Sequence, residues 1–266
     1  MDRQPVVAGQ FYPGRGPALR VQVAEYLDGD PSAQRTLLAM APHAGYIFSG
    51  KVAGKTIAQA CLARRIILMG PNHTGRGQKI AVWCDGRWIM PGFDVPVDSE
   101  LADTLIQLPG FSADYEAHLY EHSLEVVLPF LGQSMDDFTI VPVAVSESDP
   151  HALLKAGKKL GQELKKKSIE VSLVVSSDMS HYISHDQAKT IDRLAIDQIL
   201  AMDPEGLYQV VMRNKISMCG VLPMVLGLAC IRELGAQHAE LVAYSTSGEI
   251  NQDYSRVVGY AGILIS

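Results

Sequence analysis

The feature that most constrains the fold of this chain is a series of short apolar runs, each followed by a stretch of helical periodicity. The runs are continuous and rich in β-branched and long aliphatic residues, which is typical of strands buried on both faces of a sheet. They are Thr36–Ala41, Arg65–Met69, Phe138–Val145, Val171–Ser176, Leu241–Ser245 and Val257–Ile265. Strands that alternate with helices predict an α/β fold with three layers, in which helices cover both faces of a mixed, mainly parallel sheet.

The segments between these runs have the periodicity of amphipathic helices. We expect helices at Ser49–Ala63, Ser99–Leu108, His122–Leu131, Asp149–Lys165, Ser184–Ala201, Pro204–Arg213 and Cys219–Leu234. The helix that begins at Ser184 has a capping-box start. Asp85-Gly86 separates Ile80–Cys84 from Arg87–Met90 and predicts a hairpin turn between them. No linker, repeat or low-complexity segment interrupts the chain, so we expect one domain over residues 1–266.

The charge balance argues against a nucleic-acid surface. The chain has 23 Lys and Arg against 29 Asp and Glu, a formal net charge of −6. Its one basic run, residues 158–167, lies on a predicted amphipathic helix and is interpreted as a solvated helix face, so we expect no direct nucleic-acid binding.

The chain also lacks the signals of membrane insertion and export. No stretch approaches the roughly 18 apolar residues of a membrane span, so we expect no membrane association. Met1–Pro5 has no apolar h-region, and the four cysteines form no C-x-x-C pair. We therefore expect a cytoplasmic protein with reduced thiols.

Histidines follow three of the predicted strands, at the point where each strand ends. His43, His73 and His181 come within a few residues of Ala41, Met69 and Ser176. Ligands of open α/β sheets bind beyond the carboxyl ends of the strands, which parallel strands bring to one edge. Each histidine alone could be a hydrogen-bonded loop residue, but three at equivalent positions predict a shared site. Neutral imidazole is the commonest metal ligand, so this edge is a candidate metal centre.

Cys219 and His122 are further candidates. Cys219 falls at the predicted first turn of a helix, where the helix N-terminus favours the thiolate that binds metals; from the residues alone, a buried structural thiol is the preferred interpretation. His122 either enters the pocket or begins a helix. The glycines Gly70 and Gly75 have the spacing of a phosphate-binding loop without its Lys and Ser/Thr, and no serine-hydrolase elbow is present.

Several motifs together resemble the Memo family, whose prokaryotic members are called protein B of the AmmeMemoRadiSam system. The likeness runs in order from residue 5 to the C-terminus. The motifs are Val7–Pro13, Ala41–Tyr46, Gly70–His73, Glu121–Glu125, Ser176–His181, Met218–Gly220 and Val257–Gly262.

The resemblance implies a fold similar to that of the class III extradiol (LigB-type) dioxygenases. It implies one metal ion held by His43, His73 and Cys219, with His181 as an acid/base residue and Asp178 beside it. Glu121, His122 and Tyr46 are expected to line the pocket. Iron is the first expectation for the metal. The dioxygenases use a carboxylate where this chain has Cys219, and the softer thiolate makes copper or zinc alternatives.

Three functions remain open from the sequence. The first is a metal-binding accessory protein that works with AMMECR1-like and radical-SAM partners and recognises a small-molecule or peptide ligand in the pocket. The second is a non-haem iron-dependent oxidoreductase, similar to the dioxygenases, that acts on a small organic substrate. The third is a metal-free remnant of that fold, with Cys219 as nucleophile and His181 as base.

Overall fold

Four parallel strands form the centre of the sheet: β1 (Leu38–Ala41), β8 (Ser172–Ser176), β2 (Arg65–Pro71) and β7 (Thr139–Val145). The computed structural model describes residues 1–266. The strand order of the nine-stranded sheet is β10-β11-β1-β8-β2-β7-β3-β6, and β9 pairs with β11. Outside the parallel centre, β11 and β3 run antiparallel to their neighbours β1 and β7. The predicted mixed sheet with a parallel centre is confirmed.

The remaining strands lie toward the edges of the sheet or outside it. They are β3 (Ile80–Val82), β4 (Arg87–Met90), β5 (Phe93–Pro96), β6 (Ser112–Ala113), β9 (His181–Ile183), β10 (Ala239–Thr246) and β11 (Val257–Ile265). The helices are α1 (Gly16–Tyr26), α2 (Tyr46–Gln59), α3 (Ser99–Ile106), α4 (Leu128–Ser134), α5 (Pro150–Lys166), α6 (His185–Leu200), α7 (Pro204–Asn214), α8 (Val221–Leu234) and α9 (Gly248–Asn251), with a 3-10 turn, η1, at Glu125–Val127.

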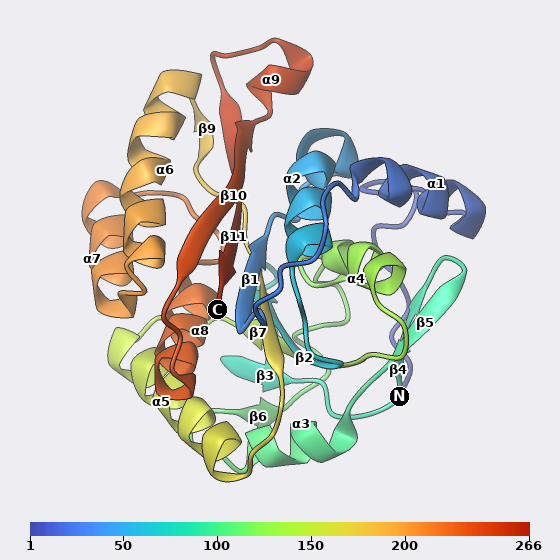
Figure 1. The fold of residues 1–266 in the computed structure, drawn as a ribbon, viewed down its shortest axis with the longest axis vertical. Coiled ribbons are helices and arrows are strands. Elements are labelled where there is room, and N and C mark those ends of the chain that lie inside the picture. The colour runs from blue at the N-terminus through green and yellow to red at the C-terminus, as the bar shows by residue number, and fades with distance from the viewer.

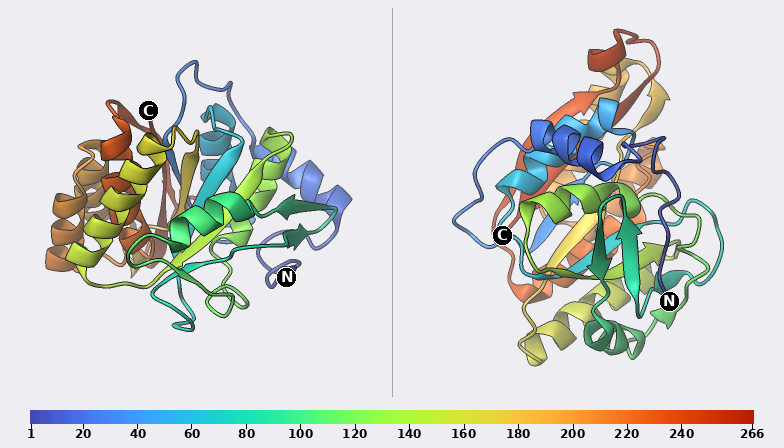
Figure 2. Two further views of the ribbon diagram at one scale, coloured as in Figure 1. Left: turned by 90° about the horizontal axis from the view of Figure 1, so that it is seen from below. Right: turned by 90° about the vertical axis from the view of Figure 1, so that its right-hand side faces the viewer.

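Helices cover both faces of the sheet, which gives the three predicted layers (Figures 1 and 2). Neighbouring residues of one strand belong to different cores, because successive side chains point to opposite faces. In β1, Leu38 and Met40 join the core beneath α5, α7 and α8, whereas Ala39 and Ala41 join the core beneath α1, α2 and α4. Burial on both faces explains why the strands read as continuous apolar runs.

One predicted connection is wrong. Asp85-Gly86 does not join two paired strands, because β3 is taken into the main sheet beside β7. Its expected partner, β4, pairs instead with β5. The turn between β4 and β5 contains Gly92, whose φ of +86° suits glycine. The local sequence marks the turn at Gly86 correctly, but it cannot show that a distant strand competes for β3.

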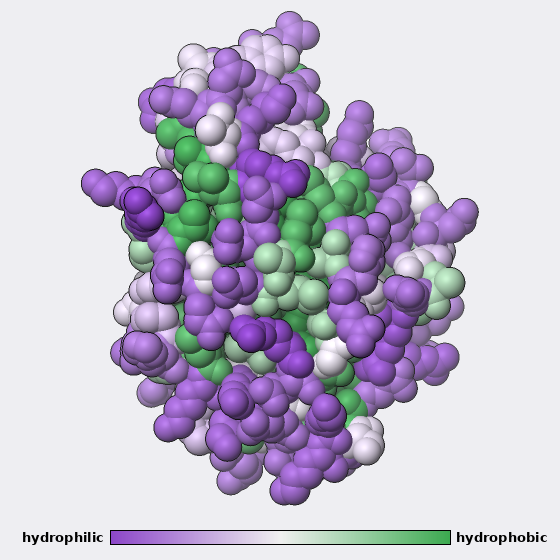
Figure 3. Space-filling model, turned by 60° about the vertical axis from the view of Figure 1, so that its left-hand side comes forward, coloured by the Kyte–Doolittle hydropathy of each residue, from purple (hydrophilic) through white to green (hydrophobic).

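The surface agrees with the interpretation of the charged residues. Lys158, Lys159 and Lys165–Lys167 are all exposed along α5. On the face shown in Figure 3, hydrophobic residues gather near the middle and hydrophilic residues surround them. No helix combines the length and the apolar character needed to cross a membrane.

Candidate metal centre

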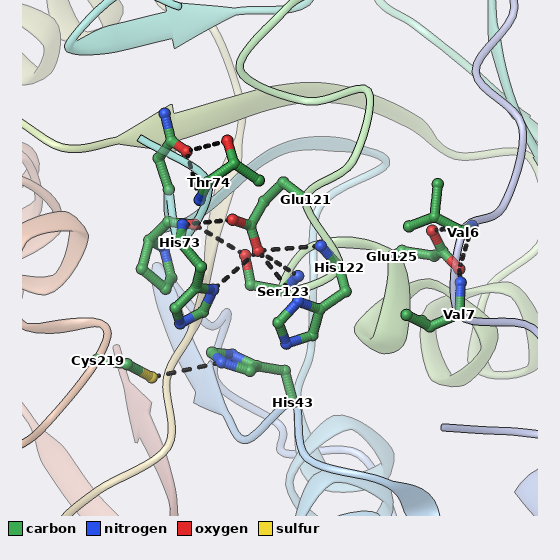
Figure 4. A network of polar contacts seen from close by, with 12 residues as sticks. Val6, Val7, His43, His73, Thr74, Glu121, His122, Ser123, Glu125 and Cys219 are labelled. Carbon is green, nitrogen blue, oxygen red and sulfur yellow. Dashed lines mark hydrogen bonds and ion pairs between the residues drawn. The ribbon is translucent and has the colours of Figure 1, made fainter. Parts of the chain in front are cut away.

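Three imidazole rings meet at the carboxyl edge of the parallel strands (Figure 4). His43 follows β1, His73 follows β2, and His122 comes from the loop between β6 and η1. Each offers one ligand atom, and these atoms all lie within 4.8 Å of one another. The ring centroids are 5.0 to 5.6 Å apart. This is the only group of His, Cys, Asp or Glu residues in the structure with spacing suited to holding a metal ion.

His43 is the buried member, and its hydrogen bonds determine which nitrogen is free. The hydroxyl group of Ser176 donates to the carbonyl oxygen of Ser123 at 2.6 Å, so it must accept in its 2.6 Å contact with Nδ1 of His43. Nδ1 therefore carries the proton and Nε2 has a free lone pair. Burial lowers the pKa of His43 well below its usual value, and the neighbouring imidazoles of His122 and His73 lower it further. The ring is neutral, as a metal ligand must be.

His73 is oriented by Glu121. Its Nδ1 lies 2.9 Å from Oε1 of Glu121, and its main-chain N–H donates to Oε2 of the same carboxylate. The main-chain N–H groups of His122 and Ser123 also donate to Oε1, at 3.0 and 2.9 Å. A carboxylate behind a histidine fixes the ring and leaves Nε2 for a metal. One buried carboxylate thus holds two of the three imidazole-bearing residues in place.

The electrostatics of this pair follow from its hydrogen bonds. Burial would raise the pKa of Glu121, but the hydrogen bond and charge of His73, together with main-chain N–H groups, lower it to about 2. Burial is the largest single effect on His73 and would lower its pKa, but the hydrogen bond to Glu121 and the negative charges of Glu121 and Asp178 together raise that pKa. Burial lowers the pKa of His122. Glu121 supplies the negative charge at the site, which favours a bound cation.

Cys219 contacts His43 rather than all three imidazoles. Its sulfur lies 3.3 Å from Nε2 of His43 and accepts the main-chain N–H of Asp178 at 3.2 Å. The predicted place of Cys219 in the first turn of the helix is wrong, because α8 begins at Val221. Burial raises the pKa of its thiol, which agrees with the interpretation as a structural thiol. A neutral thiol can donate to Nε2 of His43. A neutral thiol is a poorer nucleophile than a thiolate, so the raised pKa does not favour the metal-free hypothesis.

Asp178 and His181 lie beside the cluster, and each forms its hydrogen bonds with other residues. Asp178 accepts the main-chain N–H of His43 at 2.8 Å, and burial raises the pKa of its carboxyl group. His181 begins β9, and its Nδ1 lies 2.9 Å from the carbonyl oxygen of Ser217. That carbonyl can only accept, so Nδ1 carries the proton and Nε2 is free to take one. Ser217, not Asp178, orients His181.

Tyr46 supports the site from within the core. Its side chain is 2% exposed, and its hydroxyl group donates to the carbonyl oxygen of Val126 at 2.8 Å. Its ring packs against those of Tyr12 and Phe130. It therefore fixes the start of α2 against the segment after His122, and it adds no atom to the imidazole cluster.

Comparison with known proteins decides the family. A family profile described as Memo-like protein matches residues 3–264. A MEMO1 family protein of Methanopyrus kandleri is 39% identical, with 99% of each chain covered. One from Aquifex aeolicus is 37% identical over 98% of each chain. The chain belongs to the Memo family. An uncharacterized protein of Escherichia coli K12 shares the fold of this Memo-family chain, with a TM-score of 0.54, 14% identity, and 85% of this chain and 99% of that chain covered.

Within this Memo-family chain, strand ends alone do not identify the imidazole cluster. His43 and His73 meet as predicted from the ends of β1 and β2, but the third predicted histidine, His181, does not join their cluster. Its place is taken by His122, which the sequence placed only among pocket-lining residues. The sequence signal that could have identified His122 is the Glu121–Glu125 motif. Its residue Glu121 orients His73, and the next residue, His122, faces the rings of His43 and His73.

Proposed function

We propose that this Memo-family protein binds one transition-metal ion between His43, His73 and His122. The observation that carries this proposal is the mutual approach of three ligand atoms within 4.8 Å. The hydrogen bonds of His43 to Ser176 and of His73 to Glu121 support it, because each engages Nδ1 and turns Nε2 toward the cluster; binding of the ion would replace any proton on Nε2 of His73. Imidazole nitrogens suit zinc, copper, iron and nickel.

The sulfur of Cys219 is the proposed additional donor. It already lies 3.3 Å from a nitrogen that would bind the ion, and binding would replace its proton. Iron remains our first expectation for the metal, with copper and zinc as alternatives that a sulfur donor favours.

Metal analysis of protein purified without chelator tests this function. We expect about one equivalent of metal per chain in the wild type, and strong loss in H73A and H122A. The exposed His151 provides the matched control, so H151A should keep the metal. The C219S variant separates a three-imidazole site from one that includes sulfur. Full metal content in H73A and H122A would contradict the proposal.

The resemblance to the prokaryotic members of the AmmeMemoRadiSam system is the ground for proposing a role beside protein partners. We propose that the metal-bound protein acts as an accessory protein to AMMECR1-like and radical-SAM proteins, with a small molecule or peptide recognised at the pocket. Pull-down with each purified partner, with and without metal, tests this role. Binding to neither partner would count against it.

A second candidate function, an oxidoreductase, is favoured by the openness of the site. The side chains of His73 and His122 are 37% and 26% exposed, so a substrate could approach the cluster. A bound iron would supply the redox chemistry. His181 would take a proton on its free Nε2 while Ser217 holds the opposite nitrogen. Oxygen uptake with catechols and Fe(II) tests this function, and a wild-type rate no higher than that of H43A would exclude it for those substrates.

A further inference from the structure

The N-terminal residue Arg3 is buried against the loop that carries Glu121 and His122. Its side chain is 1% exposed and forms an ion pair with Glu125, 2.8 Å from Nη1 to Oε2. Its Nε donates to the carbonyl oxygen of His118 at 2.9 Å, and its Nη2 donates to the carbonyl oxygen of Glu121. A fully buried guanidinium group is costly unless its donors are satisfied. Here the guanidinium group donates to three residues of one loop, His118, Glu121 and Glu125.

The other side of Arg3 is attached to a fixed part of the fold. Its main-chain N–H donates to Arg87 and its carbonyl oxygen accepts from Ile89, both at 2.8 Å, so this residue extends the β4–β5 hairpin. Its guanidinium carbon lies 4.1 Å from the ring centroid of Trp88, within cation–π distance. Arg3 therefore links the loop to a two-stranded support.

Glu125 completes this attachment from the end of the loop. Its carboxylate accepts the main-chain N–H groups of Val6 and Val7 at 2.8 and 3.0 Å, as Figure 4 shows. It also accepts the hydroxyl group of Tyr12 at 2.6 Å. The N-terminal segment and the loop are thus joined by one buried network.

The decisive contact is at the peptide bond between Glu121 and His122. Its carbonyl oxygen accepts from Arg3, and its N–H donates to Oε1 of Glu121 at 3.0 Å. Both polar atoms of this peptide unit are therefore fixed. The unit joins the carboxylate that orients His73 to the imidazole of His122, so its rotation would move both.

We propose that Arg3 is a positioning residue of the metal centre, which holds this peptide unit so that Glu121 and His122 face the other two histidines. The inference rests on the proposed metal-binding function. Arg3 is not itself a proposed ligand, and its side chain contacts none of the proposed metal ligands. Lysine cannot replace arginine here, because one ammonium group cannot reach three acceptors that a planar guanidinium group spans.

The first test compares R3K with R65K in titrations with Zn²⁺. Arg65 is a matched control, since it makes two hydrogen bonds to Asp98 at 2.6 and 3.0 Å but lies at the end of β2 remote from His73. We expect R3K to weaken binding roughly 10- to 100-fold, as loss of an outer-shell partner does. R65K should change it less than about threefold. In an H122A background, the effect of R3K should shrink markedly, since His122 is one of the groups through which Arg3 acts.

The second test needs no metal. Hydrogen exchange of the His122 and Ser123 amides, both of which donate to Glu121, should be faster in R3K than in R65K at equal global stability. If R3K does not fold, Y12F removes a single hydrogen bond to Glu125 and should show the same two changes in smaller measure. The inference would be overturned if R3K (or Y12F) matched R65K both in its affinity for Zn²⁺ and in the exchange rates of the His122 and Ser123 amides. If the wild type binds no metal while R3K still accelerates exchange at these amides, the proposed function fails and the positioning role of Arg3 stands.

Discussion

At the scale of single residues, Glu121 does most to organise the candidate metal centre. Its two oxygens accept hydrogen bonds from His73, His122 and Ser123, and its side chain is 1% exposed. A charged acceptor makes these bonds roughly twice as strong as neutral ones. The residue binds no metal itself in this arrangement, yet two of the three imidazole-bearing residues depend on it.

Replacing Glu121 by Gln should weaken metal binding about 10- to 100-fold. Glutamine has one acceptor oxygen, and its amide group would face donors that the carboxylate now accepts. The pKa of His73, which Glu121 raises, should also fall. Titration with Zn²⁺ measures the first effect and NMR titration of the His73 ring the second. The exposed neighbour Glu116 gives the control E116Q; equal affinities in the two variants would show that the carboxylate is dispensable.

His118 makes stability depend on pH. It is fully buried, with its ring packed edge-on against both Trp83 and Trp88. Its Nε2 donates to the carbonyl oxygen of Ala81 at 3.0 Å, and its Nδ1 has no partner. Burial lowers its pKa to about 4. In the unfolded chain the pKa of His118 is about 6.5. Below pH 6.5 the unfolded state therefore binds a proton at His118 that the folded state does not bind. The stability of the protein therefore falls as the pH falls from 6.5 toward 4.

We expect His118 to cost about 2 kcal/mol of unfolding free energy between pH 7.5 and pH 5. In H118Q that part of the loss should disappear, although the variant is less stable at pH 7.5. The pKa values of His43 and His122 are also lowered by burial, and they contribute equally in both proteins. Urea unfolding at the two pH values measures the difference. An identical pH dependence in the two proteins would mean that His118 takes up its proton as readily in the folded protein as in the unfolded chain.

At the scale of elements, α5 and α8 pack closely because α5 has glycine at their contact. A Cβ atom at Gly157 would lie well inside van der Waals contact of the carbonyl oxygen of Leu226 and 2.9 Å from Cβ of Ala229. Gly161, one turn later, faces the carbonyl oxygen of Cys230 in the same way. The atoms nearest to each added Cβ are main-chain carbonyl oxygens of α8, which cannot change rotamer to make room as a side chain can.

The variant G157A should therefore lose about 1 to 3 kcal/mol of stability by overpacking. Alanine is favoured over glycine inside a helix by roughly 1 kcal/mol, so the sign of the change decides between packing and helix propensity. The exposed Lys155 lies on the other side of α5, and K155A should stay within about 0.5 kcal/mol of the wild type. Thermal and urea unfolding provide both values. A stabilised G157A would show that the two helices separate easily.

The sequence identifies the elements better than their partners. The last strand has the predicted bounds, Val257–Ile265, because apolar residues fill both of its faces. Ser184 is confirmed as the N-cap of α6, since its hydroxyl oxygen accepts from the main chain of Gln187; the Gln187 side chain accepts from the Ser184 hydroxyl rather than from the Ser184 main-chain N–H that a full capping box requires. The failure at β3 concerns pairing between residues 80–82 and 143–145, which no local pattern encodes. The segment after His122 is also irregular, a 3-10 turn followed by a short helix rather than one helix.

At the scale of the whole molecule, the candidate site is assembled from three distant parts of the chain. His43 and His73 could be predicted because parallel strands bring their ends to one edge. His122 could not, since its loop is placed by long-range contacts such as those of Arg3 and Glu125. A bound ion would join all three parts. It would therefore resist unfolding of the molecule as a whole rather than of one element.

Metal binding should accordingly raise the thermal stability of the entire fold. At a free concentration 100 times the Kd, a ligand that binds only the folded state adds about 2.7 kcal/mol, which is roughly 5 to 10 °C for a domain of this size. Differential scanning calorimetry with Zn²⁺ as the probe measures the shift. H122A should lose it, because one of three ligands is gone, whereas H151A should keep it. An H122A protein that retains the full shift would place the ion elsewhere, and the three-imidazole site would then have to be abandoned. If the protein instead unfolds in a single cooperative transition whose midpoint temperature rises as Zn²⁺ is added, the result would agree with an ion that bridges the three segments.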